Sequence, residues 1–283
     1  MTNTNGDVFT ITTTQMELKK NDNAPRASSF IPQLEKRHFL IKCLPISTVD
    51  MICMFLGELF GTTLLLLFGC MGGLNWAGTE QPAFVGPFIF GLVVMSLVQC
   101  FGTISGAHFN PAVTLCALIY RLISIPMAIA YLIAQVAGAI MGFGLFMLLT
   151  PDGIFRPEGT IGAGICSTVP RPELTTVQVF FLEYFATTVL ITLCCSSWDP
   201  RNAQQQDSVA IKFGFAVSVL SMTVGPATGN SMNPARTLGP ALLNGDWDLH
   251  WVYWVAPMSA ALITTLIYKA LFFRDAPAAK KDS

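Results

Sequence analysis

The sequence carries the motif Asn-Pro-Ala twice, in SGAHFNPAVT (residues 105–114) and in GNSMNPARTLGP (residues 229–240). Each copy opens a short apolar segment, at about Asn110–Ile119 and Asn233–Leu243. Neither segment can cross a bilayer, because a spanning helix needs about 20 apolar residues. Asn is favoured at a helix N-cap, and Pro at the first helical position loses no hydrogen bond, since its N–H would be unpaired there. Each motif therefore predicts a half-helix that enters the membrane from one side.

Around the two motifs the composition is that of a membrane protein. Of the 283 residues, 52% are hydrophobic and 12% are charged, against about 25% charged in a soluble domain. The net charge is −1 and no basic stripe is present, so no nucleic-acid partner is expected. Six apolar windows are long enough to span a bilayer, at about 48–73, 84–104, 123–149, 176–198, 209–225 and 250–273.

The two halves of the apolar region resemble each other. Phe90-Gly91-Leu92 matches Phe213-Gly214-Phe215 at the spacing that also relates the two Asn-Pro-Ala copies. Each repeat contains three spans, an odd number, so the second copy must be inserted upside down. The predicted fold is an all-α membrane protein with six transmembrane helices, two re-entrant half-helices and an inverted internal repeat. Gly138 and Gly142, four residues apart, are expected to let helices approach closely.

Charge placement predicts the domain organisation and the orientation. Residues 1–45 are polar and then basic, which predicts a disordered cytoplasmic arm, and residues 274–283 form a basic cytoplasmic tail. Residues 46–273 form one membrane domain between them, with repeats at about 48–149 and 176–273. Almost all eight cysteines lie in or beside apolar runs and only Cys166 lies in a clear loop, so we expect no disulfide framework.

The two half-helix ends predict a distinctive electrostatic site. Unpaired N–H groups and partial positive charge at two facing helix N-termini repel cations and protons. Asn110 and Asn233 each add an amide N–H₂ group that can bind the oxygen of a neutral polar solute. Glu58 and Glu183 occupy matching places in the first helix of each repeat. A carboxyl group inside a membrane span is expensive, so we predict that both accept hydrogen bonds from backbone N–H groups near the half-helices.

The paired motifs resemble the signatures of the aquaporin (major intrinsic protein) family, over about residues 48–273. The resemblance implies a passive channel in the lipid bilayer, usually a homotetramer with one pore per subunit. We expect a plasma-membrane protein with both termini in the cytoplasm. It is not expected to be an enzyme or to need a cofactor. The implied pore motifs are Asn110, Pro111, Ala112, Asn233, Pro234 and Ala235.

The resemblance also implies a selectivity filter that decides which solutes pass. By matching spacing, the filter residues are Phe90, Ser221, Asn230 and Arg236. Water-selective members typically hold a histidine where this chain has Ser221, so the predicted opening is wider. Thr237 stands where ordinary aquaglyceroporins have an aspartate. This mixture is similar to the insect entomoglyceroporins, and it implies water, glycerol and urea as the permeants.

Other functions remain open at this point. A strict water channel differs only in the size of the opening at Ser221, and a junctional or adhesive membrane protein with a residual pore belongs to the same family. A secondary transporter would need ion ligands, and at membrane depth the sequence offers only Glu58, Glu183 and Arg236. His108 either lines the cytoplasmic vestibule or is a residue beside the helix cap whose ring is hydrogen-bonded within the protein. Flux measurements separate the channel from these alternatives.

Overall fold

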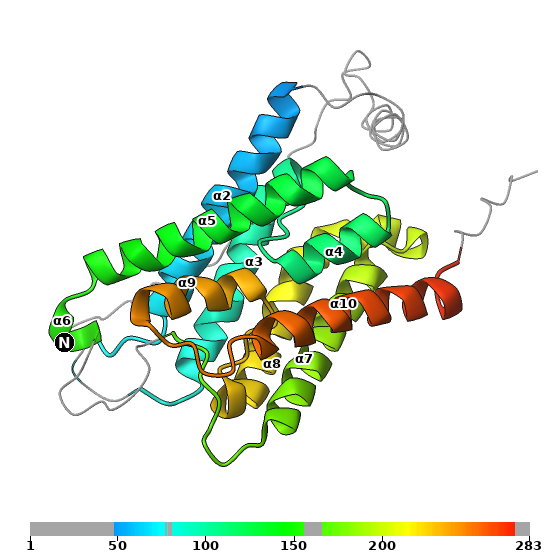
Figure 1. Ribbon diagram of the computed structural model, residues 1–283. Helices are drawn as coiled ribbons and strands as arrows, with labels where there is room; N and C mark the ends of the chain where they lie inside the picture. The colour runs from blue at the N-terminus through cyan, green and yellow to red at the C-terminus, as the bar shows by residue number, and fades with distance from the viewer. Residues whose placement is uncertain (1–47, 77, 79–80, 156–165, 275–283) are drawn as a thin grey trace, which may run out of the picture. The chain divides into compact units, whose positions relative to one another are not determined.

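The computed structural model describes residues 48–76, 78, 81–155 and 166–274, and these residues form helices and loops without a β-strand (Figure 1). The predicted N-terminal arm lies outside the described residues, as does all of the predicted tail except residue 274. Six helices in the described ranges are long and apolar enough to cross a membrane. They are α2 (Thr48–Met71), α3 (Val85–Ser105), α5 (Ile125–Leu149), α7 (Thr176–Ser197), α8 (Val209–Thr228) and α10 (Val252–Leu271).

Two short helices follow the two Asn-Pro-Ala motifs. They are α4 (Pro111–Ile119) and α9 (Pro234–Asn244), and each begins at the proline of its motif. The remaining elements are α6 (Asp152–Phe155) and a 3-10 helix at Pro200–Ser208 that leads into α8. The prediction of an all-α membrane fold with six spans and two half-helices is confirmed, with span ends that differ from the expected ones by a few residues.

The helices pair in a way that reflects the repeat. α2 packs most extensively against α5, its counterpart α7 packs against α10, and α3 packs against α8 across the two repeats. Each half-helix contacts the last helix of the other repeat: α4 lies along α10, and α9 lies along α5 (Figure 1). The two half-helices are therefore held inside the bundle, where their N-termini can meet.

The close contact between α2 and α5 depends on glycine. A Cβ atom on Gly138 would lie 2.5 Å from the Leu59 carbonyl oxygen, and one on Gly142 would overlap the Thr63 carbonyl oxygen. A backbone carbonyl in a helix cannot move aside, so any larger residue must push the two helices apart. Gly138 and Gly142 thus occupy the helix interface that their spacing predicted.

Replacing Gly142 with alanine should destabilise the folded protein by about 1–3 kcal/mol through overpacking. Gly144→Ala is a matched control on the same helix, because its Cβ would make only an ordinary contact, 3.8 Å from Leu243 Cδ1. That control should stay within about 1 kcal/mol of the wild type. Thermal unfolding of detergent-solubilised protein, followed by size-exclusion chromatography, measures both. Equal melting temperatures for the two variants would contradict the packing argument.

Candidate functional site

Each half-helix begins with an asparagine cap. Asn110 has an extended backbone, and its Oδ1 accepts a hydrogen bond from Ala112 N at 2.8 Å. Asn233 Oδ1 accepts from Ala235 N at 3.0 Å and from Arg236 N at 3.2 Å. These side chains satisfy amide groups that have no partner within the helix. The Asn-Pro-Ala motif therefore starts the helix in both repeats by the same local chemistry.

The amide nitrogens of the same two asparagines join the repeats crosswise. Asn110 Nδ2 donates to Met232 O at 2.9 Å, and Asn233 Nδ2 donates to Phe109 O at 2.8 Å. The two helix N-termini consequently lie side by side although the motifs are far apart in the sequence. A side-chain amide carries two N–H donors, so each asparagine keeps one for a solute.

A buried glutamate in the first helix of repeat one holds the loop that precedes α4. Glu58 is fully buried. It accepts from His108 N at 2.9 Å and from Phe109 N at 2.7 Å. The Ser105 hydroxyl and the Gln135 amide also donate to it, at 2.7 and 2.8 Å. The carboxyl group thus supplies partners for backbone N–H groups that would otherwise be unpaired inside the membrane.

Repeat two contains the equivalent arrangement. Glu183 is fully buried. It accepts from Ser231 N at 3.0 Å, from Met232 N at 2.9 Å and from the Thr228 hydroxyl at 2.6 Å. The two repeats differ in that no side chain in repeat two is found to take the place of Gln135 among the described residues. Both glutamates therefore contact backbone of the loops that carry the motifs.

Both loops hold non-glycine residues in the left-handed backbone region. Ala107 and Phe109 have φ values of 51° and 50°, and Asn230 and Met232 have φ values of 45° and 50°. This conformation is uncommon for residues with a Cβ atom and costs of order 1–3 kcal/mol each. It persists because the surrounding hydrogen bonds, including those to the two glutamates, fix the loops. Strain of this kind is typical of functional sites.

A cavity of about 120 Å³ lies between the repeats. That volume is enough for several water molecules. Trp198 and Gln206, near the junction of α7 and α8, line one part of it, and Phe90 and Arg236 line another. The cavity also touches His108, Asn110 and Asn233. One cavity is therefore lined by both motif asparagines, by two of the predicted filter residues and by the predicted vestibule histidine.

Two predicted filter residues, Ser221 and Asn230, lie just beyond this lining. Val209, Phe213 and Val217 line the cavity at intervals of four residues along α8. Ser221 is the next residue on that helix face, because positions four apart lie above one another on a helix. Asn230 Nδ2 donates to Ser221 Oγ at 3.0 Å. The Asn230 Oδ1 atom is buried and has no hydrogen-bond partner among the described residues.

The other half of the predicted filter is a cation next to an aromatic ring. The Arg236 guanidinium carbon lies 5.5 Å from the centre of the Phe90 ring. Its Nη1 donates to the Cys166 carbonyl oxygen at 2.6 Å. Arg236 is buried, as expected for an arginine that faces an internal cavity and not the lipid.

His108 has features of both interpretations that the sequence left open. It lines the cavity. Its Nδ1 atom also lies 3.1 Å from the Thr114 hydroxyl, and its ring packs edge-on against Tyr131 with centroids 5.1 Å apart. The ring is therefore a fixed part of the cavity wall with a satisfied nitrogen.

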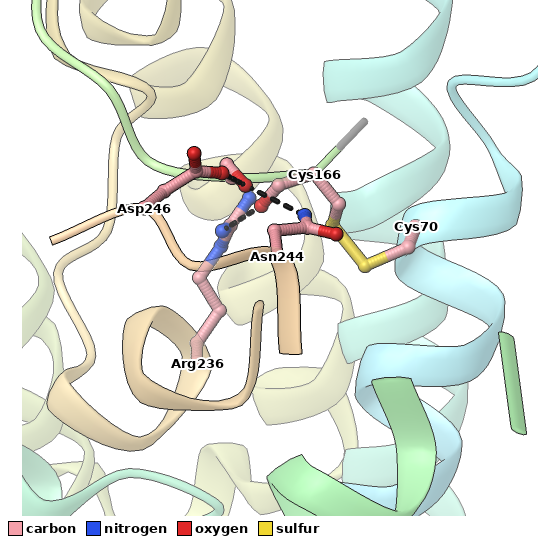
Figure 2. The surroundings of a disulfide bond; sticks show 6 residues. Cys70, Cys166, Arg236, Asn244 and Asp246 are labelled. Atoms are coloured by element: carbon pink, nitrogen blue, oxygen red, sulfur yellow. Dashed lines mark hydrogen bonds between the residues drawn. A yellow bond between two sulfur atoms is a disulfide. The ribbon is translucent and has the colours of Figure 1, made fainter. Parts of the chain in front are cut away.

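The expectation of no disulfide is wrong. Cys70, near the end of α2, is bonded to Cys166 in the loop that precedes α7 (Figure 2). Cys70 follows an apolar run, so in the sequence it resembles a core residue. In space, however, the end of α2 lies next to residue 166, although the two cysteines are 96 residues apart. Five other cysteines in the described residues are free.

Six spanning helices, two half-helices and an internal cavity define a multi-pass membrane protein built around a pore-like site. Residues 45–268 match the family described as Major intrinsic protein. The chain belongs to this family, whose members are membrane channels.

Individual relatives give the same assignment. The chain is 36% identical to aquaporin-4 of Mus musculus over 222 residues, which cover 77% of this chain and 67% of the relative. It is 34% identical to aquaporin-2 of Ovis aries over 221 residues, which cover 78% and 79%. The solved structure of the aquaglyceroporin from Plasmodium falciparum has the same fold, with a TM-score of 0.68 at 22% identity, over 78% of this chain and 96% of that chain.

Proposed function

We propose that this protein is a passive channel for water and small neutral solutes, including glycerol and urea, and that it excludes protons and ions. The observation that carries the proposal is the small side chain at Ser221, the next position on the α8 face that lines the cavity. By the family resemblance, a water-selective channel holds a histidine there. A serine leaves more room at the filter and keeps it polar.

The chemistry of the filter suits a solute that both donates and accepts hydrogen bonds. Arg236 has five N–H donors, of which one is given to the Cys166 carbonyl. Ser221 Oγ accepts one hydrogen bond from Asn230 Nδ2, so its O–H group can still donate and its second lone pair can still accept. The Phe90 ring offers an apolar surface beside Arg236. A polyol can pair its hydroxyl groups with the polar atoms and its carbon atoms with the ring.

A strictly water-selective channel is the second candidate, and one contact favours it. Asn230 donates to Ser221, so the Asn230 side chain occupies part of the space that a histidine would fill. An asparagine side chain is smaller than a histidine side chain. The wider filter therefore requires that Asn230 leaves part of the opening free.

Exclusion of ions follows from the two half-helix ends. α4 and α9 point their N-termini toward each other, joined by the crosswise hydrogen bonds of Asn110 and Asn233. Their partial positive charges disfavour cations and hydronium, while the remaining amide N–H donors accept a neutral oxygen. The motif prolines and alanines (Pro111, Ala112, Pro234 and Ala235) are buried at the start of the two helices and shape this junction.

Placement in the cell and assembly belong to the same proposal. We assign residues 46–273 to the channel domain, both termini to the cytoplasm, and the protein to the plasma membrane as a homotetramer of the entomoglyceroporin type. The basic terminal segments support the orientation. The Cys70–Cys166 disulfide supports it too, because disulfides persist on the oxidising, external side of the membrane.

Stopped-flow light scattering on proteoliposomes tests the proposed function. Water, glycerol and urea permeabilities should all exceed those of empty liposomes, and a proton-sensitive dye inside the vesicles should report no added proton leak. Water flux without glycerol or urea flux would select the strict water channel. No flux of water, glycerol or urea above that of empty liposomes would contradict the proposal and favour a junctional role.

A further inference from the structure

The filter arginine is held by a backbone carbonyl from a distant loop. Arg236 Nη1 donates to Cys166 O at 2.6 Å, and no other side-chain hydrogen bond of Arg236 is found in the described ranges. Figure 2 shows the Arg236 side chain reaching toward the Cys166 backbone, with the disulfide to Cys70 leading from that residue to α2. The orientation of the guanidinium therefore depends on where residue 166 is held.

Residue 166 has a backbone conformation that needs support. Its φ value is 72°, in the left-handed region that a residue with a Cβ atom rarely adopts. The disulfide ties its side chain to the end of α2. On the other side, the Ser167 hydroxyl accepts from Asn244 Nδ2 at 2.8 Å and donates to Asp246. The Cys166 carbonyl thus lies between two attachments, one covalent and one made of hydrogen bonds.

The loop beyond Cys166 is attached to the filter region as well. Thr168 Oγ1 donates to Thr237 Oγ1 at 3.0 Å, and Arg171 N donates to Ala227 O at 2.9 Å. Residues that follow Cys166 therefore remain bound to α9 and α8, the helices on either side of the second motif loop, even without the disulfide. Removing the disulfide should loosen Cys166 and its carbonyl, which then keep only the attachment through Ser167, while the rest of the loop stays in place.

We propose that the Cys70–Cys166 disulfide is a positioning element of the selectivity filter, which holds the Cys166 carbonyl where it aligns Arg236 and so helps to set which solutes pass. This inference rests on the filter role proposed above for Arg236. A released guanidinium is free to swing into the pore. It then obstructs a three-carbon solute more than it obstructs water.

The main test removes the disulfide by the double substitution Cys70→Ser with Cys166→Ser. The glycerol-to-water permeability ratio in proteoliposomes should fall about threefold, the size of effect expected when one hydrogen bond is lost. Cys53→Ser with Cys100→Ser is the matched control, because both cysteines are free and exposed on the helix surface. That control should keep the wild-type ratio. A ratio in the disulfide variant that is unchanged or higher overturns the proposal.

A second measurement covers the case in which the double variant does not fold. Folded protein carrying Cys53→Ser and Cys100→Ser is treated in detergent with a water-soluble phosphine and then reconstituted. The phosphine takes oxygen from water and becomes a phosphine oxide, while Cys70 and Cys166 each become a thiol. Alkylation and mass spectrometry give the reduced fraction. The glycerol-to-water ratio should fall in proportion to that fraction, and a constant ratio at full reduction overturns the proposal.

The variant Arg236→Val separates failure of this inference from failure of the proposed function. If Arg236→Val leaves the solute ratio unchanged, Arg236 is not a filter residue and the proposed function loses its basis. If Arg236→Val changes the ratio, removing the disulfide in that background should change it no further, because both substitutions act through one side chain. An equal drop in both backgrounds would place the action of the disulfide elsewhere and overturn the inference.

Discussion

Replacing Ser221 with histidine should lower glycerol and urea permeability about tenfold and leave water permeability within about twofold. The imidazole adds bulk on the α8 face just beyond the cavity and narrows the opening beside Arg236 and Phe90. A larger solute must then pass with fewer of its polar groups paired. Each lost hydrogen bond costs about 0.5–1.5 kcal/mol, and about 1.4 kcal/mol corresponds to a tenfold change in rate. Stopped-flow permeability measurements on proteoliposomes provide the readout.

Two further substitutions control for this result. Ser221→Ala keeps the small side chain, so glycerol permeability should remain high. Asn230→Ala removes the side chain that donates to Ser221, so the glycerol-to-water ratio should rise if Asn230 restricts the opening. Unchanged glycerol flux in Ser221→His, at equal protein content, would remove the argument that the residue at position 221 sets the solute range.

Replacing Glu183 with glutamine should greatly reduce the yield of folded channel. Three donors point at the Glu183 carboxyl group, from Thr228, Ser231 and Met232. Glutamine replaces one acceptor oxygen with an N–H₂ donor, so at least one buried donor loses its partner. An unsatisfied buried donor costs about 1–3 kcal/mol. The left-handed backbone at Met232 also loses support. Thermal unfolding in detergent and water flux per folded molecule measure the effect.

Glu173→Gln is the matched control for this substitution. Glu173 forms an ion pair with Arg171 at 3.2 Å, but both side chains are more than half exposed. Exposed ion pairs contribute little to stability, about 0–1 kcal/mol. The control should therefore unfold at the wild-type temperature. Equal behaviour of Glu183→Gln and Glu173→Gln would show that the buried carboxyl group does not hold the motif loop.

The fold was predictable because a bilayer restricts which backbone conformations are stable. Backbone groups in lipid must be paired within the segment, so apolar stretches of sufficient length become helices. The two segments after Asn110 and Asn233 are too short to span, and the proline after each asparagine marks where the helix starts. The similarity of the two halves then determined the inverted arrangement. Local chemistry, hydropathy and the internal repeat together therefore sufficed for the architecture.

The contacts of the predicted filter residues could not be predicted from the sequence. The carbonyl that binds Arg236 belongs to a loop residue 70 positions away, and any backbone carbonyl looks the same in a sequence. The contact between Ser221 and Asn230 depends on how a loop returns to its own helix. One signal was available for the disulfide: Cys166 is the one cysteine in a clear loop, and loop cysteines outside the cytoplasm tend to pair. Its partner Cys70 directly follows an apolar run and so resembles a core residue.

The crosswise hydrogen bonds of the two asparagines also determine when the protein can finish folding. Asn110 needs Met232, which is synthesised 122 residues later. The first half-helix can complete its N-terminal contacts only after the ribosome has delivered most of the second repeat. Until then, its polar end must be sheltered by water or by the insertion machinery. The two half-helices are thus joined late in biogenesis. A chain truncated before residue 232 lacks the Met232 carbonyl and cannot form this contact between them.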